Sequence, residues 1–126
     1  MVARTQLARI RGLGAAGSGT QEYWLVKLTS VALLPLTLYL IGALVALRHA
    51  GHADMAAAVS SAWIALPLFF FILANAVHMR IGMQNVIDDY IHSKGLKKIV
   101  SAANAFFSWG ASGAAVYFLL KLGIGA

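Results

Sequence analysis

Three long apolar segments constrain the possible fold of this chain more than any other feature of its sequence. They lie at about 24–47, 55–89 and 99–120, and each can cross the ~30 Å hydrocarbon core of a bilayer as a helix that rises ~1.5 Å per residue. Of the 126 residues, 60% are hydrophobic, which is more apolar surface than a soluble domain of this size can bury. We therefore predict an all-α integral membrane protein with three transmembrane helices, divided into a basic arm at 1–21 and an anchor domain at 22–126.

The basic residues lie mainly at the edges of these segments, where they set the orientation of a membrane protein. The net charge of +6 therefore indicates topology, and we expect no nucleic-acid partner. We predict that the N-terminus and the second loop face the cytoplasm (or matrix) and that the C-terminus lies on the opposite side. The predicted inner side carries Arg4, Arg9, Arg11, Lys94, Lys97 and Lys98, and the outer side carries Arg48 and Lys121.

The sequence also excludes several kinds of site. It contains no cysteine, so this chain holds no disulfide and no cysteine-ligated iron–sulfur cluster, and any redox centre must be held by histidine or by a partner. A G-x-G-x-x-G match runs from Gly12 to Gly17, but no strand precedes it and a membrane span follows, so we reject a dinucleotide site. The same glycine-rich stretch is not the apolar core of a signal peptide, and we expect the first helix to remain in the mature protein.

Two features predict how the helices pack. Pro35 and Pro67 fall inside the first and second segments, where each should kink its helix and leave a carbonyl for a neighbouring group to satisfy. One face of the third segment is made of small residues at helical spacing, which lets another helix approach closely in lipid. We expect the three helices to form part of a larger bundle. The small-residue face consists of Ser101, Ala105, Ser108, Ser112 and Ala115.

The segment from His78 to Tyr90 carries the chemistry. The second apolar run ends at Val77, and the helical pattern continues beyond it, so His78 lies roughly 15 Å deep in the membrane. A neutral imidazole there either bonds to a neighbouring helix or ligates a metal with one nitrogen and donates through the other. Gly82, four residues on, lies on the same face and leaves room for a porphyrin, although a close helix contact would explain it equally well.

The chain cannot supply both axial ligands of one haem. His49 and His52 lie at the other end of the second segment, on the order of 35 Å from His78, and His92 is about 20 Å away. Two imidazoles on one iron require nitrogens only ~4 Å apart, given iron–nitrogen bonds of ~2 Å. A bis-histidine haem would therefore need its second ligand from another polypeptide or from a copy of this one.

Other polar residues near the inner membrane surface have two interpretations each. Arg80 and Lys27 are expected to extend their charged ends towards the headgroups, although Lys27 could also contact a quinone or a haem propionate. Asp89 and Tyr90 are, from residue types alone, a solvated acid and an interfacial aromatic residue. Their functional alternative is a quinone site, in which a tyrosine hydroxyl donates to a quinone carbonyl and a carboxylate relays protons.

The pattern His-x-x-Ile-Gly-Met-(x)5-Asp-Tyr, from His78 to Tyr90, resembles the small hydrophobic membrane anchor (D-type subunit) of succinate dehydrogenase, respiratory complex II. The stretches 11–16 and 24–30 look like the alphaproteobacterial version of that subunit. One departure is Lys27, where such relatives often carry arginine, and a bidentate contact there is therefore in doubt.

The resemblance implies a function and a set of partners. His78, with Gly82 beside it, would ligate the iron of a haem b shared with a larger cytochrome b anchor subunit, and Tyr90 and Asp89 would bind ubiquinone. FAD and the iron–sulfur clusters would belong to separate flavoprotein and iron–sulfur subunits. This chain would then be a non-catalytic anchor of a bacterial inner-membrane enzyme of the respiratory chain and tricarboxylic acid cycle, with a periplasmic C-terminus.

Two alternatives are also compatible with the sequence. The chain could be the equivalent anchor of a fumarate reductase, which the sequence does not distinguish. It could also be a haem-free structural or transporter-accessory subunit in which His78 only bonds a neighbouring helix, because polar residues within a membrane are ambiguous by themselves.

Overall fold

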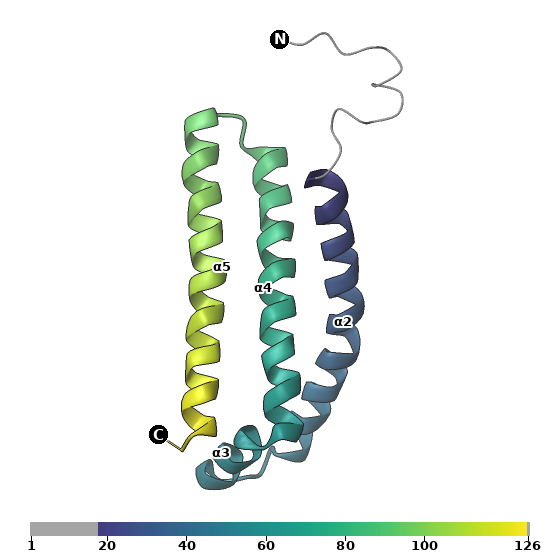
Figure 1. Cartoon of the computed structure of the whole chain (residues 1–126), viewed down its shortest axis with the longest axis vertical. Helices are drawn as coiled ribbons and strands as arrows, with labels where there is room; N and C mark the ends of the chain where they lie inside the picture. Colours follow the sequence, from purple (N-terminus) through teal and green to yellow (C-terminus); the bar gives the residue numbers. More distant parts are fainter. Residues whose placement is uncertain (1–17, 126) are drawn as a thin grey trace.

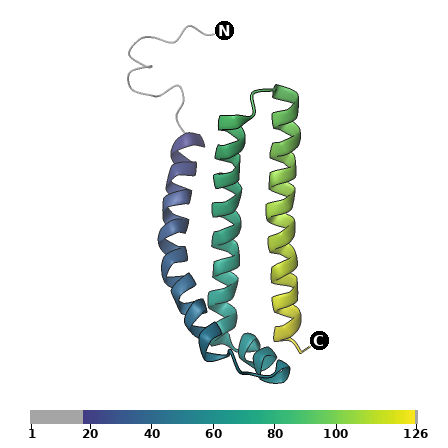
Figure 2. The same cartoon turned by 180° about the vertical axis from the view of Figure 1, so that it is seen from behind.

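The computed structural model describes residues 18–125, and this part of the chain is entirely helical apart from short connections. Its elements are α2 (Ser18–Ala46), α3 (His52–Ser60), α4 (Ala62–Tyr90) and α5 (Lys94–Gly123). The three long helices stand side by side with α4 in the middle, in contact with both α2 and α5 (Figures 1 and 2). All three are long and apolar enough to cross a membrane. The all-α prediction with three candidate spans is therefore confirmed for the described residues.

The first and third segments agree closely with the helices. The segment 24–47 falls within α2 except for its last residue, and 99–120 falls within α5. Residues 18–21, which we assigned to the N-terminal arm, are the first turn of α2. The rest of the arm, with its glycine motif and three arginines, lies outside the described residues.

The prediction that the second helix begins near Met55 is wrong. Residues 52–60 form the separate helix α3, and the membrane-spanning helix α4 begins only at Ala62. The break is at Ser61, whose backbone is extended (φ −70°, ψ 145°) and whose hydroxyl donates to the Ala58 carbonyl at 2.6 Å. A side chain that bonds nearby backbone competes with the helix, so serine favours such a boundary. Two consecutive serines, Ser60 and Ser61, were the signal that hydropathy alone concealed.

The short helix α3 lies across one end of the bundle (Figure 1). It packs against α4 and α5, and the Ser60 hydroxyl, which is 2.6 Å from its own helix's Ala56 carbonyl, is also 3.0 Å from the Leu122 carbonyl at the end of α5. This helix therefore contacts both the start of α4 and the end of α5, at the end of the molecule opposite the α4–α5 loop.

Pro67 lies in the second turn of α4 and leaves the carbonyl four residues earlier, at Trp63, without its helical donor. The Tyr39 hydroxyl of α2 donates to that carbonyl at 2.5 Å. The expectation that a neighbouring helix would satisfy a proline-freed carbonyl is confirmed at this position. Pro35 lies within α2, which continues as one helix and curves along its length (Figure 1).

Most of the predicted small-residue face of α5 is at least partly buried inside the same chain, next to α4, whereas Ala115 is exposed. Ser108 is completely buried, and the Asn104 amide donates to the Arg80 carbonyl at 2.9 Å. One turn nearer the loop, the Gln84 amide donates to the Ser101 hydroxyl at 2.9 Å. The stripe therefore explains how α4 and α5 approach each other.

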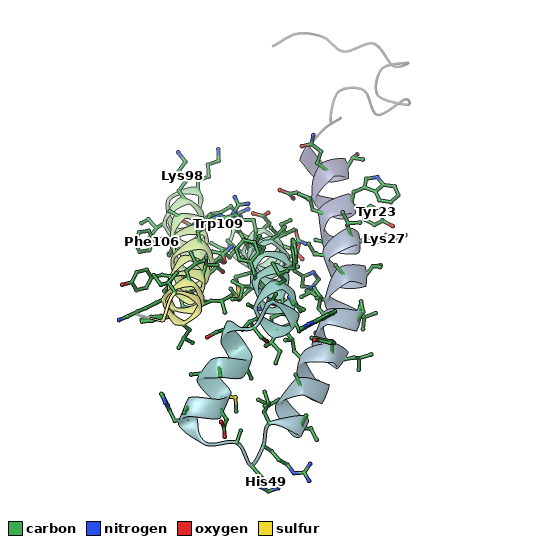
Figure 3. All side chains as sticks on the ribbon, turned by 60° about the horizontal axis from the view of Figure 1, so that its bottom comes forward. Tyr23, Lys27, His49, Lys98, Phe106 and Trp109 are labelled. Carbon is green, nitrogen blue, oxygen red and sulfur yellow. The ribbon has the colours of Figure 1, made fainter. Side chains whose placement is uncertain are left out.

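Most large apolar side chains of the described residues are exposed, and few are buried. Only Ala76, Ile81, Ile87 and Leu119 form a buried apolar core. Phe106 and Trp109 of α5, labelled in Figure 3, are among the many exposed aromatic residues. Such a surface is stable only where lipid or other protein covers it.

Candidate functional site

His78 lies on the side of α4 that faces α2, where it meets Thr29. The Nδ1 atom of His78 is 3.1 Å from the Thr29 hydroxyl oxygen, and Thr29 is only 9% exposed. The Nε2 atom has no hydrogen-bond partner among residues 18–125, yet it is not sealed from the surface of this chain. The imidazole is thus held at one nitrogen and accessible at the other.

Gly82 follows His78 by one helical turn on the same face. It is exposed, and a Cβ atom built at this position would meet no atom within 4 Å. Nothing within the described chain therefore requires a glycine here, and α2 does not approach it closely. The space left by the missing side chain could admit a planar group or a helix of a partner.

A hollow of about 310 Å³ continues from this face towards the N-terminal end of α2. It lies between α2 and α4, and Asn85, three residues beyond Gly82, contributes its α4 side. The hollow has no signal in the sequence, because its polar residues come from two segments that lie far apart in the chain. It is lined by Glu22, Tyr23, Val26, Ile81 and Asn85.

Asp89 and Tyr90 end α4 at the same end of the molecule as the α4–α5 loop (Figure 2). Tyr90 is 79% exposed, and Asp89 is exposed with no hydrogen bond or ion pair among the described residues. Both lie about 16 to 18 Å along the helix axis from His78, so they form a second site separate from it. Each residue of an α-helix is rotated by about 100° around the axis from the one before it. Asp89 therefore lies on the same side of α4 as His78, and Tyr90 points about a third of a turn away.

Asp88, unlike Asp89, is bonded to other side chains of the described residues. It accepts from the Gln84 amide at 3.0 Å, and the Lys97 ammonium lies 3.8 Å from its carboxylate. Both groups are substantially exposed, so the pair contributes at most about 1 kcal/mol. Asp88 thus helps to fix the α4–α5 turn and leaves Asp89 available.

The Lys27 side chain extends along α2 towards the first turns of that helix. Its ammonium lies 5.6 Å from the Tyr23 ring centroid and 5.8 Å from the Trp24 ring centroid, towards the N-terminal end of α2. Figure 3 shows Tyr23 and Lys27 projecting side by side. A lysine stem that lies along the helix and places its charge among interfacial aromatic residues is typical of a membrane edge.

No second metal ligand lies near His78 within the described chain. His49 lies in the loop at the opposite end (Figure 3), where it accepts from the Arg48 guanidinium at 3.1 Å. His52 begins α3, and His92 follows α4. No group of three or more potential metal-binding side chains occurs among residues 18–125. A metal at His78 would have to be shared with another polypeptide or carried by a cofactor.

Comparisons with known proteins agree with the motif in α4. The family model described as succinate dehydrogenase/fumarate reductase transmembrane subunit matches residues 1–120. The succinate dehydrogenase hydrophobic membrane anchor subunit of Paracoccus denitrificans is 35% identical over 118 residues, covering 91% of this chain and 88% of that protein. The protein of the same name from Rickettsia bellii (strain RML369-C) is 25% identical over 105 residues, covering 83% of this chain and 84% of its own length.

No solved structure matches the chain significantly. The family match covers nearly the whole sequence, and the three candidate spans make the protein a multi-pass membrane protein. The resemblance first drawn from residues 78–90 is confirmed. The chain belongs to the family of succinate dehydrogenase/fumarate reductase transmembrane subunits and is similar over most of its length to the hydrophobic membrane anchors of succinate dehydrogenase.

Proposed function

We propose that this chain anchors a succinate:ubiquinone oxidoreductase in the bacterial inner membrane, co-ligates haem b through His78 and contributes Tyr90 and Asp89 to the ubiquinone-reduction site. The observation that carries the haem assignment is the hydrogen bonding of the His78 imidazole. His78 is bonded at Nδ1 and accessible at Nε2, and it lies one turn from Gly82, where no atom of the described residues fills the space of the missing side chain.

The residues around His78 fit a haem. A haem b needs an imidazole nitrogen as an axial ligand, a second ligand on the other face and space for the ring. His78 would provide the nitrogen, Gly82 would leave space one turn away, and the larger cytochrome b anchor subunit would supply the second ligand. When bound, the haem adds a one-electron centre within the membrane, while this chain orients the ligand and limits access of water.

Tyr90 and Asp89 fit a role at the quinone because both side chains are exposed at the end of α4. Neither the Tyr90 hydroxyl nor the Asp89 carboxylate has a hydrogen bond within the described part of the chain. The Tyr90 hydroxyl donates to a quinone carbonyl, and the Asp89 carboxylate takes part in delivering the protons that quinone reduction consumes. Neither group oxidises succinate. That chemistry, with FAD and the iron–sulfur clusters, belongs to the flavoprotein and iron–sulfur subunits.

The proposed orientation is supported by the charged residues at one end of the bundle. The N-terminal end of α2, the C-terminal end of α4 and the α4–α5 loop lie together (Figure 1). Lys94, Lys97 and Lys98 belong to that end, which the positive-inside tendency assigns to the cytoplasm. The soluble subunits therefore dock there, and the C-terminus is periplasmic.

The anchor of a fumarate reductase is the second candidate, because the matching family includes subunits of both enzymes. The direction of electron flow is set by the quinone potential and by the partner subunits. Succinate oxidation is favoured by the similarity to two succinate dehydrogenase anchors.

Replacing His78 tests the haem assignment. The His78→Ala complex, purified with all its subunits, should lose or strongly perturb the b-type absorption bands because an axial ligand is missing. The matched control is His92→Ala, which removes an exposed histidine outside the spans. A normal b-type spectrum in the His78 variant would refute the assignment.

Replacing Tyr90 tests the quinone assignment separately. Tyr90→Phe removes one hydroxyl from an exposed side chain and should lower ubiquinone reduction while succinate oxidation by an artificial acceptor is retained. The loss expected for one hydrogen bond to the reacting substrate is about 10-fold or more. An equal loss of both activities would argue against a quinone contact.

A further inference from the structure

Thr29 is a buried polar residue of α2 that contacts His78 of α4. Thr29 and Ser108 are the two buried polar side chains among the described residues. Ser108 lies in the α4–α5 seam, whereas Thr29 lies between α2 and α4 with its hydroxyl 3.1 Å from His78 Nδ1. Because a buried hydroxyl is costly unless it is hydrogen-bonded, the partners of Thr29 decide what it does.

The single hydroxyl proton of Thr29 is already committed. Its oxygen lies 2.7 Å from the Leu25 carbonyl and 3.0 Å from the Val26 carbonyl, both in the preceding turn of α2. A carbonyl oxygen can only accept, so the threonine proton points to this turn, and 2.7 Å is a typical length for such a bond. The oxygen then faces His78 with a lone pair, and the bond between the two side chains needs its proton from Nδ1.

We propose that Thr29 is a positioning residue for His78, accepting the Nδ1 proton and thereby fixing the tautomer whose Nε2 lone pair is free to ligate iron. The inference rests on the proposed haem role of His78. A neutral imidazole carries one proton, so the nitrogen that donates to Thr29 determines which nitrogen can bind a metal. If Thr29 were the donor instead, the proton would reside on Nε2 and block ligation.

The same geometry holds the ring in place. The two carbonyls that accept from the hydroxyl restrict the Thr29 rotamer, and a β-branched side chain has few rotamers available. The acceptor is therefore already oriented before His78 binds anything. A donated Nδ1 hydrogen bond also makes an imidazole a more basic ligand, which favours the oxidised, more positive iron.

The test compares variants of the complete complex. Thr29→Val keeps the shape and removes the acceptor, Thr29→Ala removes the hydroxyl without adding bulk, and Thr29→Ser keeps the hydroxyl. The matched control is Ser30→Ala, since the Ser30 hydroxyl also bonds the Val26 carbonyl, at 2.7 Å, without touching His78. The measurements are the reduced-minus-oxidised spectrum, the haem midpoint potential and the EPR signal of the ferric haem.

We expect the valine and alanine variants to raise the haem midpoint potential and to change the ferric EPR signal. A tenfold weaker preference for ferric over ferrous iron corresponds to about 59 mV for one electron. The serine variant should restore the wild-type values, and Ser30→Ala should not change them. A purely structural role of Thr29 would lower stability without moving the potential.

The outcomes separate this inference from the function on which it rests. If His78→Ala loses its haem bands but the valine and alanine variants keep the wild-type potential and EPR signal, Thr29 does not position the ligand. A serine variant that behaves like the valine variant overturns the inference as well. If His78→Ala keeps a normal haem, the proposed haem role itself has failed.

Discussion

The two faces of α4 differ in how completely the chain occupies them. Towards α5, a fully buried serine, an amide–carbonyl bond and an amide–hydroxyl bond close the contact within the chain. Towards α2, the chain leaves one imidazole nitrogen accessible, a glycine with nothing against it and a hollow at the membrane edge. We call these contacts the α4–α5 seam and the α2–α4 seam.

The comparison teaches which polar residues of a membrane helix are structural. Gln84 of α4 and Asn104 of α5 are polar residues that bond across the α4–α5 seam, to the Ser101 hydroxyl and the Arg80 carbonyl. His78 is different because its contact with Thr29 uses only half of its hydrogen-bonding capacity. In lipid, the remaining half requires a partner, and none is present among residues 18–125.

The largest expected effect comes from filling the space at Gly82. Gly82→Leu adds a side chain at a position where a Cβ atom meets no atom of residues 18–125 within 4 Å, so the chain itself should fold and insert normally. The added group would occupy the space proposed for the porphyrin, and we expect a near-complete loss of b-type absorption in the assembled complex.

The control for this change is Gly110→Leu in α5, which is also exposed with no atom within 4 Å. It should keep the haem spectrum. A Gly82→Leu complex with an unperturbed haem would show that the open part of the α2–α4 seam is not the haem site and would remove the functional difference between the two seams.

An intermediate effect is expected from overfilling the α4–α5 seam. Ser108→Leu introduces a large side chain at a position with no exposed surface, and overpacking of this kind typically costs about 1–3 kcal/mol. Thermal unfolding of the purified complex in detergent should occur at lower temperature, whereas complexes that do assemble should retain the haem spectrum.

Ser108→Ala is the matched control, because it keeps the residue small and loses only a weak 3.4 Å contact with Asn104. It should unfold close to the wild-type temperature. If Ser108→Leu left stability unchanged and altered the haem spectrum instead, the assignment of structure to one seam and function to the other would be reversed.

Much of this organisation could be predicted from the sequence, because lipid imposes simple rules on it. Hydropathy located the three spans, and the small-residue stripe predicted a close helix contact. The depth and spacing of His78 and Gly82 made them candidates before any contact was known. These features depend on neighbours within one helix, which the 3.6-residue period fixes.

What could not be predicted depends on contacts between segments. Thr29 is 49 residues from His78 in sequence, and nothing in its own segment marks it as different from Ser30. The break at Ser61 was missed because an apolar run conceals a local competition between serine hydroxyls and the helix. The roles of Asp88 and Asp89 separate only when Lys97 and Gln84 are placed beside the former.

The smallest expected effect concerns the other end of the α2–α4 seam, where Tyr39 donates to the Trp63 carbonyl that Pro67 leaves free. Tyr39→Phe removes this donor while keeping the ring. Hydrogen bonds between membrane helices contribute about 0.6 kcal/mol on average and up to ~1.7 kcal/mol. Because Pro67 has no N–H group, no helical donor can replace the hydrogen bond that the Trp63 carbonyl loses. We therefore expect a small decrease in thermal stability with the haem spectrum unchanged.

Tyr117→Phe is the matched control, since Tyr117 is 60% exposed and its hydroxyl has no hydrogen bond within the described part of the chain. Equal stability of the two variants would mean that Tyr39 does not hold the seam, and that α2 is kept in place by its contacts near His78 or by the partner subunit. A larger loss in Tyr39→Phe, with normal haem bands, would show that the α2–α4 seam is fastened structurally at the α3 end and is open for function only near His78 and Gly82.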